Sequence, residues 1–226
     1  MKIENLYRNR FNDQAALKSK NAMWSILCKY FFQRYVKKDA IVLDLAAGYC
    51  EFINNITAKR KIAVDLNEDI RKYANDDVEV ILSRSDNLSE LEDSSVNVVF
   101  VSNFFEHLQN KEVLLSTLSE CNRVLKSGDE GILLILQPNI RFAYREYWDF
   151  IDHVLPLSDK SLAEALILKG FCINKMIPRF LPYSTKSGLP VNSFLVKWYL
   201  RLPFAWRIFG KQCFVAASKL KDATNA

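Results

Sequence analysis

The chain has 226 residues, of which 50% are hydrophobic and 25% are charged, and its formal net charge is +5. This length and composition are typical of one globular domain with a substantial core and exclude a disordered chain. No stretch is apolar for long enough to span a bilayer, and the N-terminus lacks the apolar run of a secretory signal. We therefore expect one cytoplasmic domain over 1–226.

Cysteine and histidine usage limits the chemistry. The five cysteines are scattered, odd in number and without Cys-x-x-Cys spacing, which indicates reduced and mostly buried thiols. The only two histidines lack the paired spacing of metal ligands, so we expect no metal.

Apolar residues at helical spacing predict the first element, a long helix over 13–36. It precedes the first strand, and we expect 1–37 to form a helical cap over the site described next. The residues on its apolar face are Leu17, Trp24, Leu27, Phe31 and Tyr35.

The sequence VLDLAAGYCEF, residues 42–52, is the most informative motif. A buried strand over 41–45 carries Asp44, a turn of small residues follows, and a helix is expected to begin near Glu51. The small residues let a ligand approach the backbone amides, although only Gly48 escapes the steric penalty of a positive φ. The turn residues are Ala46, Ala47 and Gly48.

A second carboxylate follows the next predicted strand, 61–64. Asp65 lies 21 positions after Asp44, a spacing that places it at the end of the neighbouring strand of a βαβ unit. There it can accept hydrogen bonds from ribose hydroxyls. A nicotinamide dehydrogenase is the natural alternative, but its fingerprint has G-x-G-x-x-G directly after the strand and no preceding carboxylate. The dehydrogenase hypothesis is therefore disfavoured.

VLDLAAGYC resembles the first motif of the class I S-adenosylmethionine-dependent methyltransferases, hydrophobic-hydrophobic-Asp-hydrophobic-Gly-x-Gly-x-Gly, with Ala46 and Cys50 in place of the outer glycines. The resemblance implies S-adenosylmethionine as cofactor, bound by the turn and by Asp65. It extends over about 38–177 and the last strand, through SNFFEHL, RVLKSGDEGILLILQPN and the Gly-Phe pair at 170–171. The cofactor residues that it implies are Asp44, Leu45, Ala46, Ala47, Gly48, Asp65, Leu66, Ser85, Asp86 and Asn103, and we add Arg10 as a partner for the methionine carboxylate.

The same resemblance, together with apolar strands that alternate with helices, predicts an α/β fold. We expect a doubly wound, Rossmann-like and mostly parallel sheet of about seven strands, with an antiparallel last strand and helices on both faces. Ser161 and Glu164 predict a capping box that opens a helix ending at Gly170.

The charge distribution is the second unusual feature. Residues 165–221 contain no Asp or Glu but ten Lys or Arg. About thirty residues, 178–210, separate the last two strands where the family needs only a hairpin, and we interpret them as a basic, aromatic insertion. Such a segment suits an anionic interface, namely a lipid headgroup layer, a pyrophosphate-linked lipid or RNA. The alternative is a helix that packs its aromatic side on the sheet, and the lack of a nucleic-acid module makes RNA the weakest choice.

Methyl transfer to a hydroxyl is helped by a base, and the resemblance places two histidines near the site. His153 is the first candidate and His107 the second, each with a structural role as the alternative. We predict methyl transfer to a small or lipid-linked acceptor such as a sugar hydroxyl, in the cytoplasm or at the inner face of a membrane. The alternatives are a binding or scaffold protein without turnover and, more weakly, an RNA methyltransferase.

Overall fold

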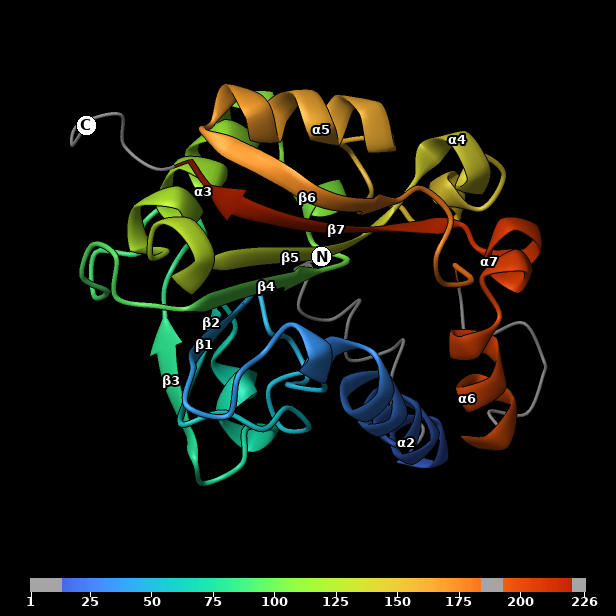
Figure 1. Cartoon of the computed structure of the whole chain (residues 1–226), viewed down its shortest axis with the longest axis horizontal. Coiled ribbons are helices and arrows are strands. Elements are labelled where there is room, and N and C mark those ends of the chain that lie inside the picture. Colours follow the sequence, from blue (N-terminus) through green and yellow to red (C-terminus); the bar gives the residue numbers. More distant parts are fainter. Residues whose placement is uncertain (1–13, 184–192, 221–226) are drawn as a thin grey trace.

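A seven-stranded sheet forms the centre of the protein in a computed structural model that describes residues 14–183 and 193–220 (Figure 1). The strand order is β3-β2-β1-β4-β5-β7-β6, and β7 alone runs in the direction opposite to the other strands. The predicted fold class is therefore confirmed. The strands are β1 (Ile41–Leu45), β2 (Arg60–Asp65), β3 (Val78–Leu82), β4 (Val98–Ser102), β5 (Ile132–Pro138), β6 (Phe171–Ile177) and β7 (Gln212–Lys219).

Helices cover both faces of the sheet (Figure 1). One face carries α3 (Lys111–Val124) and α5 (Asp159–Leu168), and the other carries α2 (Gln14–Tyr30) and α6 (Ser193–Arg201). Neighbouring residues of β1 point to opposite faces, since Val42 belongs to one core cluster and Leu43 to the other. Burial on both faces explains the continuous apolar strands. The shorter helices are η1 (Phe32–Arg34), η2 (Glu68–Lys72), η3 (Phe105–His107), η4 (Gly128–Glu130), α4 (Ile140–Ala143), η5 (Tyr147–Asp149) and α7 (Pro203–Phe209).

The first helix is shorter than the sequence predicted. α2 ends at Tyr30 and continues as the tighter turn η1. The tighter turn lets two consecutive rings enter the core: the Phe31 ring lies 4.2 Å from that of Phe180, and Phe32 is fully buried against Phe100.

The capping box of α5 is one turn earlier than predicted. Ser158 is the N-cap, its hydroxyl accepts the Ser161 N–H at 3.0 Å, and the Ser161 hydroxyl accepts the Ser158 N–H at 2.9 Å. The prediction with Ser161 and Glu164 is therefore wrong, because a second serine takes the part usually given to Glu or Gln. The helix ends before Gly170, whose φ is +76°, as expected.

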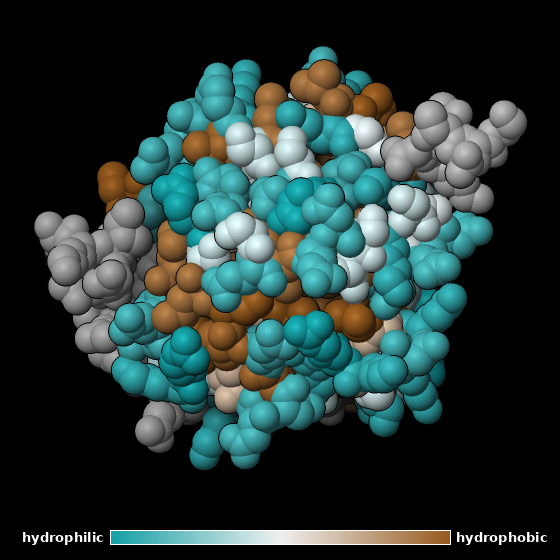
Figure 2. Space-filling model, turned by 90° about the vertical axis from the view of Figure 1, so that its left-hand side faces the viewer, coloured by the Kyte–Doolittle hydropathy of each residue, from teal (hydrophilic) through white to brown (hydrophobic). Residues whose placement is uncertain are grey.

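One side of the molecule is mostly hydrophilic. Figure 2 shows the side at the left of Figure 1, where hydrophilic residues cover most of the surface and hydrophobic residues gather near the centre. The helices α6 and α7 lie at the right of Figure 1, away from that side. Within 14–183 and 193–220, no helix has both the length and the apolar character that crossing a bilayer requires.

Candidate functional site

The carboxyl ends of β1 and β2 bring the two predicted acids to the same edge of the sheet. The strands are parallel neighbours, with Leu45 opposite Val64, and Asp65 is the last residue of β2. On its other side β1 pairs with β4, so strand order reverses here. Ligands of open α/β sheets bind at such a switch point.

The turn after β1 has an alternating backbone. Ala46, Gly48 and Cys50 have φ values of +57°, +54° and +59°, the left-handed region that favours glycine. Residues 51–55 form hydrogen-bonded turns, so the helix expected from Glu51 is absent as a regular element. Two non-glycine residues therefore adopt the conformation for which the family's motif uses glycine.

The backbone above the turn is open and is tied to Asp65. One carboxylate oxygen of Asp65 accepts the Gly48 N–H at 2.8 Å, and the other accepts the Asn67 N–H at 2.9 Å. A Cβ atom added to Gly48 would meet no atom within 4 Å. Each carboxylate oxygen can accept a further hydrogen bond. A ligand can therefore lie over Gly48 while its hydroxyls bind Asp65.

Strain in the turn gives a first prediction. Replacing Ala46 with Gly should stabilise the fold by about 1 kcal/mol, because Ala pays a steric penalty at positive φ that Gly does not. For a domain of this size the melting temperature should rise by roughly 2–4 °C. The change in melting temperature is measured by thermal unfolding followed by circular dichroism.

Ala47 provides the matched control for this prediction. Ala47 is 8% exposed and does not have a positive φ, so Ala47→Gly removes a buried methyl group and relieves no backbone strain. We expect Ala47→Gly to lower the melting temperature. Equal shifts for the two variants would show that Ala46 is unstrained.

Three carboxylates make the turn acidic. Burial raises the pKa of Asp44 well above its usual value, and the charges of Glu51 and Asp65 raise it further, against the Ile53 N–H that bonds to it at 3.3 Å. Lys20 of α2 contacts Glu51 at 2.6 Å, so the first helix lies beside the turn. A positively charged ligand would relieve the repulsion among these acids, and the sulfonium and ammonium groups of S-adenosylmethionine fit this requirement.

Two of the predicted cofactor residues, in the loop after β3 that we expect to face the adenine, make side-chain bonds of their own. The Ser85 hydroxyl lies 2.8 Å from the Thr117 hydroxyl of α3. Asp86 accepts two hydrogen bonds from Arg84, each 2.8 Å long, and this partner lowers its pKa. An adenine contact at this loop would therefore rest on backbone atoms or on lone pairs that these bonds leave available.

The remaining cofactor residues are dispersed around the same edge. Leu66 follows Asp65 and is 68% exposed, while Leu45 is fully buried. Asn103 follows β4 with a φ of +49°, and its N–H bonds to the Leu136 carbonyl at 2.8 Å. Arg10 lies outside the described residues, so its predicted contact with the methionine carboxylate stays a prediction.

The two histidines meet at the carboxyl ends of β4 and β5. Their ring centroids are 4.9 Å apart. Glu106, buried at 1% exposure, joins them, and one ligand atom from each of the three residues lies within 4.8 Å of the others. The sequence placed both histidines near the site but did not predict that they touch, because His153 lies 46 residues after His107 along the chain. The motif Glu-His-Leu was the only available signal.

Hydrogen bonds orient both rings. His107 Nδ1 lies 3.0 Å from the Asp152 carbonyl oxygen, and His153 Nδ1 lies 3.2 Å from the Tyr183 hydroxyl. Burial is the main cause that raises the pKa of Tyr183, so this phenol stays protonated. Sequence reasoning overlooked Tyr183 and Asp152 because neither belongs to a motif.

Comparison with known proteins finds a similarity to one family over part of the chain. Residues 43–135 match the family described as "Methyltransferase domain". This part of the chain is therefore similar to methyltransferase domains. No match was found among curated proteins. S-adenosylmethionine is the cofactor of class I methyltransferases, and the motif that 42–52 resembles places it at the turn after β1.

Solved structures share the fold over most of the chain. An S-adenosylmethionine-dependent methyltransferase from Archaeoglobus fulgidus is 22% identical, with a TM-score of 0.66, covering 96% of this chain and 100% of its own. A protein from Thermotoga maritima described as a possible histamine N-methyltransferase is 17% identical, with a TM-score of 0.64 and coverages of 94% and 97%. Geranyl diphosphate C-methyltransferase from Streptomyces coelicolor is 15% identical, with a TM-score of 0.60 and coverages of 88% and 79%; it was solved with Mg²⁺, geranyl diphosphate and S-adenosyl-L-homocysteine.

Proposed function

We propose that the protein transfers the methyl group of S-adenosylmethionine to a hydroxyl of a small or lipid-linked acceptor, such as a sugar. One observation carries this proposal. The acidic turn after β1 and the histidine cluster after β4 and β5 lie at the same edge of the sheet. The proposed cofactor site and the candidate base therefore face the same space above this edge.

Bound S-adenosylmethionine would supply an electrophilic methyl group attached to a positive sulfonium. In the proposed arrangement Asp65 holds the ribose hydroxyls, and the acids at Asp44 and Glu51 favour the positive charge. The protein gains rate mainly by aligning the acceptor oxygen with the methyl carbon and by excluding water. The rings of Tyr147 and Phe150, each 4.9 Å from the His153 ring, line the histidine cluster with apolar surface.

The hydrogen bonds favour His107 as the base. A carbonyl oxygen can only accept, so the Asp152 carbonyl fixes the proton of the neutral His107 ring on Nδ1 and leaves the lone pair on Nε2. Glu106 Oε1, 3.9 Å from Nε2, would stabilise the imidazolium that forms when Nε2 takes the acceptor proton. His153 faces a hydroxyl, which fixes neither tautomer. Our proposal therefore places His107 before His153, the reverse of the order from sequence.

A lipid-linked acceptor is supported by the segment 178–210, which we propose contacts the anionic surface of a membrane. The segment supplies Tyr183 to the histidine cluster and also forms α6 and α7. Six large apolar side chains of these helices are between 46% and 63% exposed. The alternative, a helix that packs its aromatic side on the sheet, fits Tyr199 and Trp206 but does not account for these six side chains. The exposed residues are Phe194, Leu195, Trp198, Phe204, Ile208 and Phe209.

The second candidate is a binding protein without turnover, favoured by the strained Ala46 and Cys50 in the cofactor turn. To separate the two, the purified protein is first titrated with S-adenosylmethionine in a calorimeter. It is then incubated with membrane extract and S-adenosylmethionine that carries a deuterated methyl group. We expect micromolar binding and a lipid-linked or soluble glycan that gains one labelled methyl, located by mass spectrometry on oxygen. Binding of S-adenosylmethionine without a labelled product, lipid-linked or soluble, would favour the binding protein. Labelled RNA would favour an RNA methyltransferase.

A further inference from the structure

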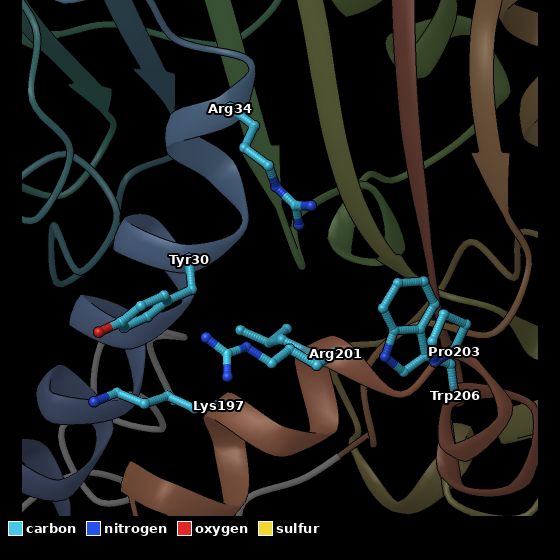
Figure 3. Close-up of a pocket in the computed structure, with 7 residues that line it drawn as sticks. Tyr30, Arg34, Lys197, Arg201, Pro203 and Trp206 are labelled. Carbon is cyan, nitrogen blue, oxygen red and sulfur yellow. The ribbon is translucent and has the colours of Figure 1, made fainter.

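A pocket of about 440 Å³ lies between the end of α2 and the pair α6 and α7, outside the histidine cluster (Figure 3). Three cations line it, Arg34 from the end of the first helical segment and Lys197 and Arg201 from α6. Tyr30 and Trp206 add aromatic walls. The pocket thus combines positive charge with apolar rings.

The three cations line the pocket, and no acid of the described residues neutralises them. Figure 3 shows the guanidinium of Arg34 directed toward Arg201, and Lys197 beside the Tyr30 ring, over which its ammonium lies 5.1 Å from the centroid. Among the described residues, these three side chains form no ion pair. The chain from 165 to 221 contains no acid at all. Like charges held together repel, so an anion that fits among them is stabilised.

The walls of the pocket are firmly attached to the core. The Trp206 indole N–H donates to the Tyr199 carbonyl at 2.7 Å, and its ring lies 5.1 Å from that of the fully buried Phe180. Arg179 donates to the carbonyls of Gly210 and Ile208, the former at 2.9 Å, and so holds the end of α7. The inner side of α6 and α7 is therefore fixed, while the outer side presents exposed rings such as Phe194 and Trp198, 5.9 Å apart.

We propose that this pocket binds the phosphate headgroup of an anionic phospholipid while the exposed rings of α6 and α7 enter the bilayer interface. The inference deepens the proposed membrane contact, on which it rests, by naming the headgroup site. The three cations attract the negative charge of a phosphate diester, and aromatic and aliphatic side chains beside them suit the boundary between headgroups and acyl chains. The proposed ligand is a lipid in a bilayer rather than free phosphate.

The test is vesicle co-sedimentation without cofactor or acceptor, so that its outcome is independent of methyl transfer. Vesicles of phosphatidylcholine alone are compared with vesicles that also contain phosphatidylglycerol. We expect binding only to the anionic vesicles, with an affinity that falls as salt rises. The triple variant Arg34→Gln, Lys197→Gln, Arg201→Gln should bind on the order of a hundredfold more weakly, since each basic residue near an anionic surface contributes about fivefold.

A matched control removes the same charge from exposed positions outside the pocket. Lys111 of α3, Lys160 of α5 and Lys175 of β6 are exposed, and their triple change to Gln should leave vesicle binding nearly intact. Equal losses in both triples would reduce the effect to net charge and overturn the proposal. Vesicle binding by the pocket triple that is as tight as that of the wild type would also overturn the proposal.

Two further measurements distinguish the apolar contact and the ligand source. The pair Phe204→Ser, Ile208→Ser should weaken vesicle binding, whereas Ile167→Ser, Leu168→Ser, an equally exposed pair on α5, should leave it unchanged. Inorganic phosphate and glycerol phosphate, tested by calorimetry, should bind far more weakly than vesicles. Binding as tight as that of vesicles would identify a small-anion site and contradict docking. If the pocket triple still methylates a soluble acceptor, a loss of vesicle binding concerns the docking inference alone and leaves the proposed methyl transfer intact.

Discussion

Replacing Asp65 with Ala should weaken binding of S-adenosylmethionine by roughly one to two orders of magnitude. The proposed cofactor pose gives Asp65 two ribose hydroxyls, and a hydrogen bond to a charged group contributes about 1.5–3 kcal/mol. Asp65 also accepts the N–H groups of Gly48 and Asn67, so its loss loosens the turn beneath the cofactor. Calorimetric titration with S-adenosylmethionine and with S-adenosylhomocysteine measures the effect.

Two variants separate ribose binding from damage to the turn. Asp65→Asn keeps one acceptor oxygen and the size of the side chain, so it should bind the cofactor better than Asp65→Ala but worse than wild type. Asp129→Ala removes an exposed carboxylate from η4, at the amino end of β5, and should bind as wild type does. Undiminished binding by Asp65→Ala would place the cofactor away from the ends of β1 and β2.

The sheet and its acidic edge were predictable because local signals determine them. Residues 41–45 are apolar and end at small residues, and the spacing from Asp44 to Asp65 is that of one βαβ unit. Each signal lies within about twenty residues, the range over which periodicity and turn chemistry apply. The structure places both acids as this reasoning expected.

The histidine cluster was not predictable in the same way, because it depends on where distant loops meet. Val154 and Leu155 donate their N–H groups to the Glu106 carbonyl, at 2.8 and 3.1 Å, and this pairing brings His153 to His107. No spacing rule encodes such a contact. The outward rings of α6 and α7 were equally hidden, since a sequence that is aromatic on all sides does not reveal which rings reach the core.

Replacing His107 with Ala should lower the rate of methyl transfer by about 10²- to 10⁴-fold, the usual contribution of a positioned base. Binding of S-adenosylmethionine should change little, because the proposed cofactor contacts lie after β1 and β2 rather than after β4. The rate is measured with the acceptor that the labelling experiment identifies, and binding by calorimetry. His107→Gln should be equally impaired, since an amide cannot take the proton. A loss of cofactor affinity that accounted for the loss of rate would make His107 a binding residue.

His153→Ala and a chelator decide between a base and a metal at this cluster. If His107 is the base and His153 only packs beside it, His153→Ala should retain more activity than His107→Ala, and treatment with EDTA should leave the wild-type rate unchanged. Two imidazoles and a carboxylate are also a common ligand set for divalent transition metals, and both Nδ1 atoms are held by outer partners, as in many metal sites. A metal ligand set predicts similar losses in both variants, inactivation by EDTA and rescue by Zn²⁺ or Mn²⁺. That pattern would contradict proton transfer to His107, because a nitrogen bound to a metal has no lone pair left for the acceptor proton.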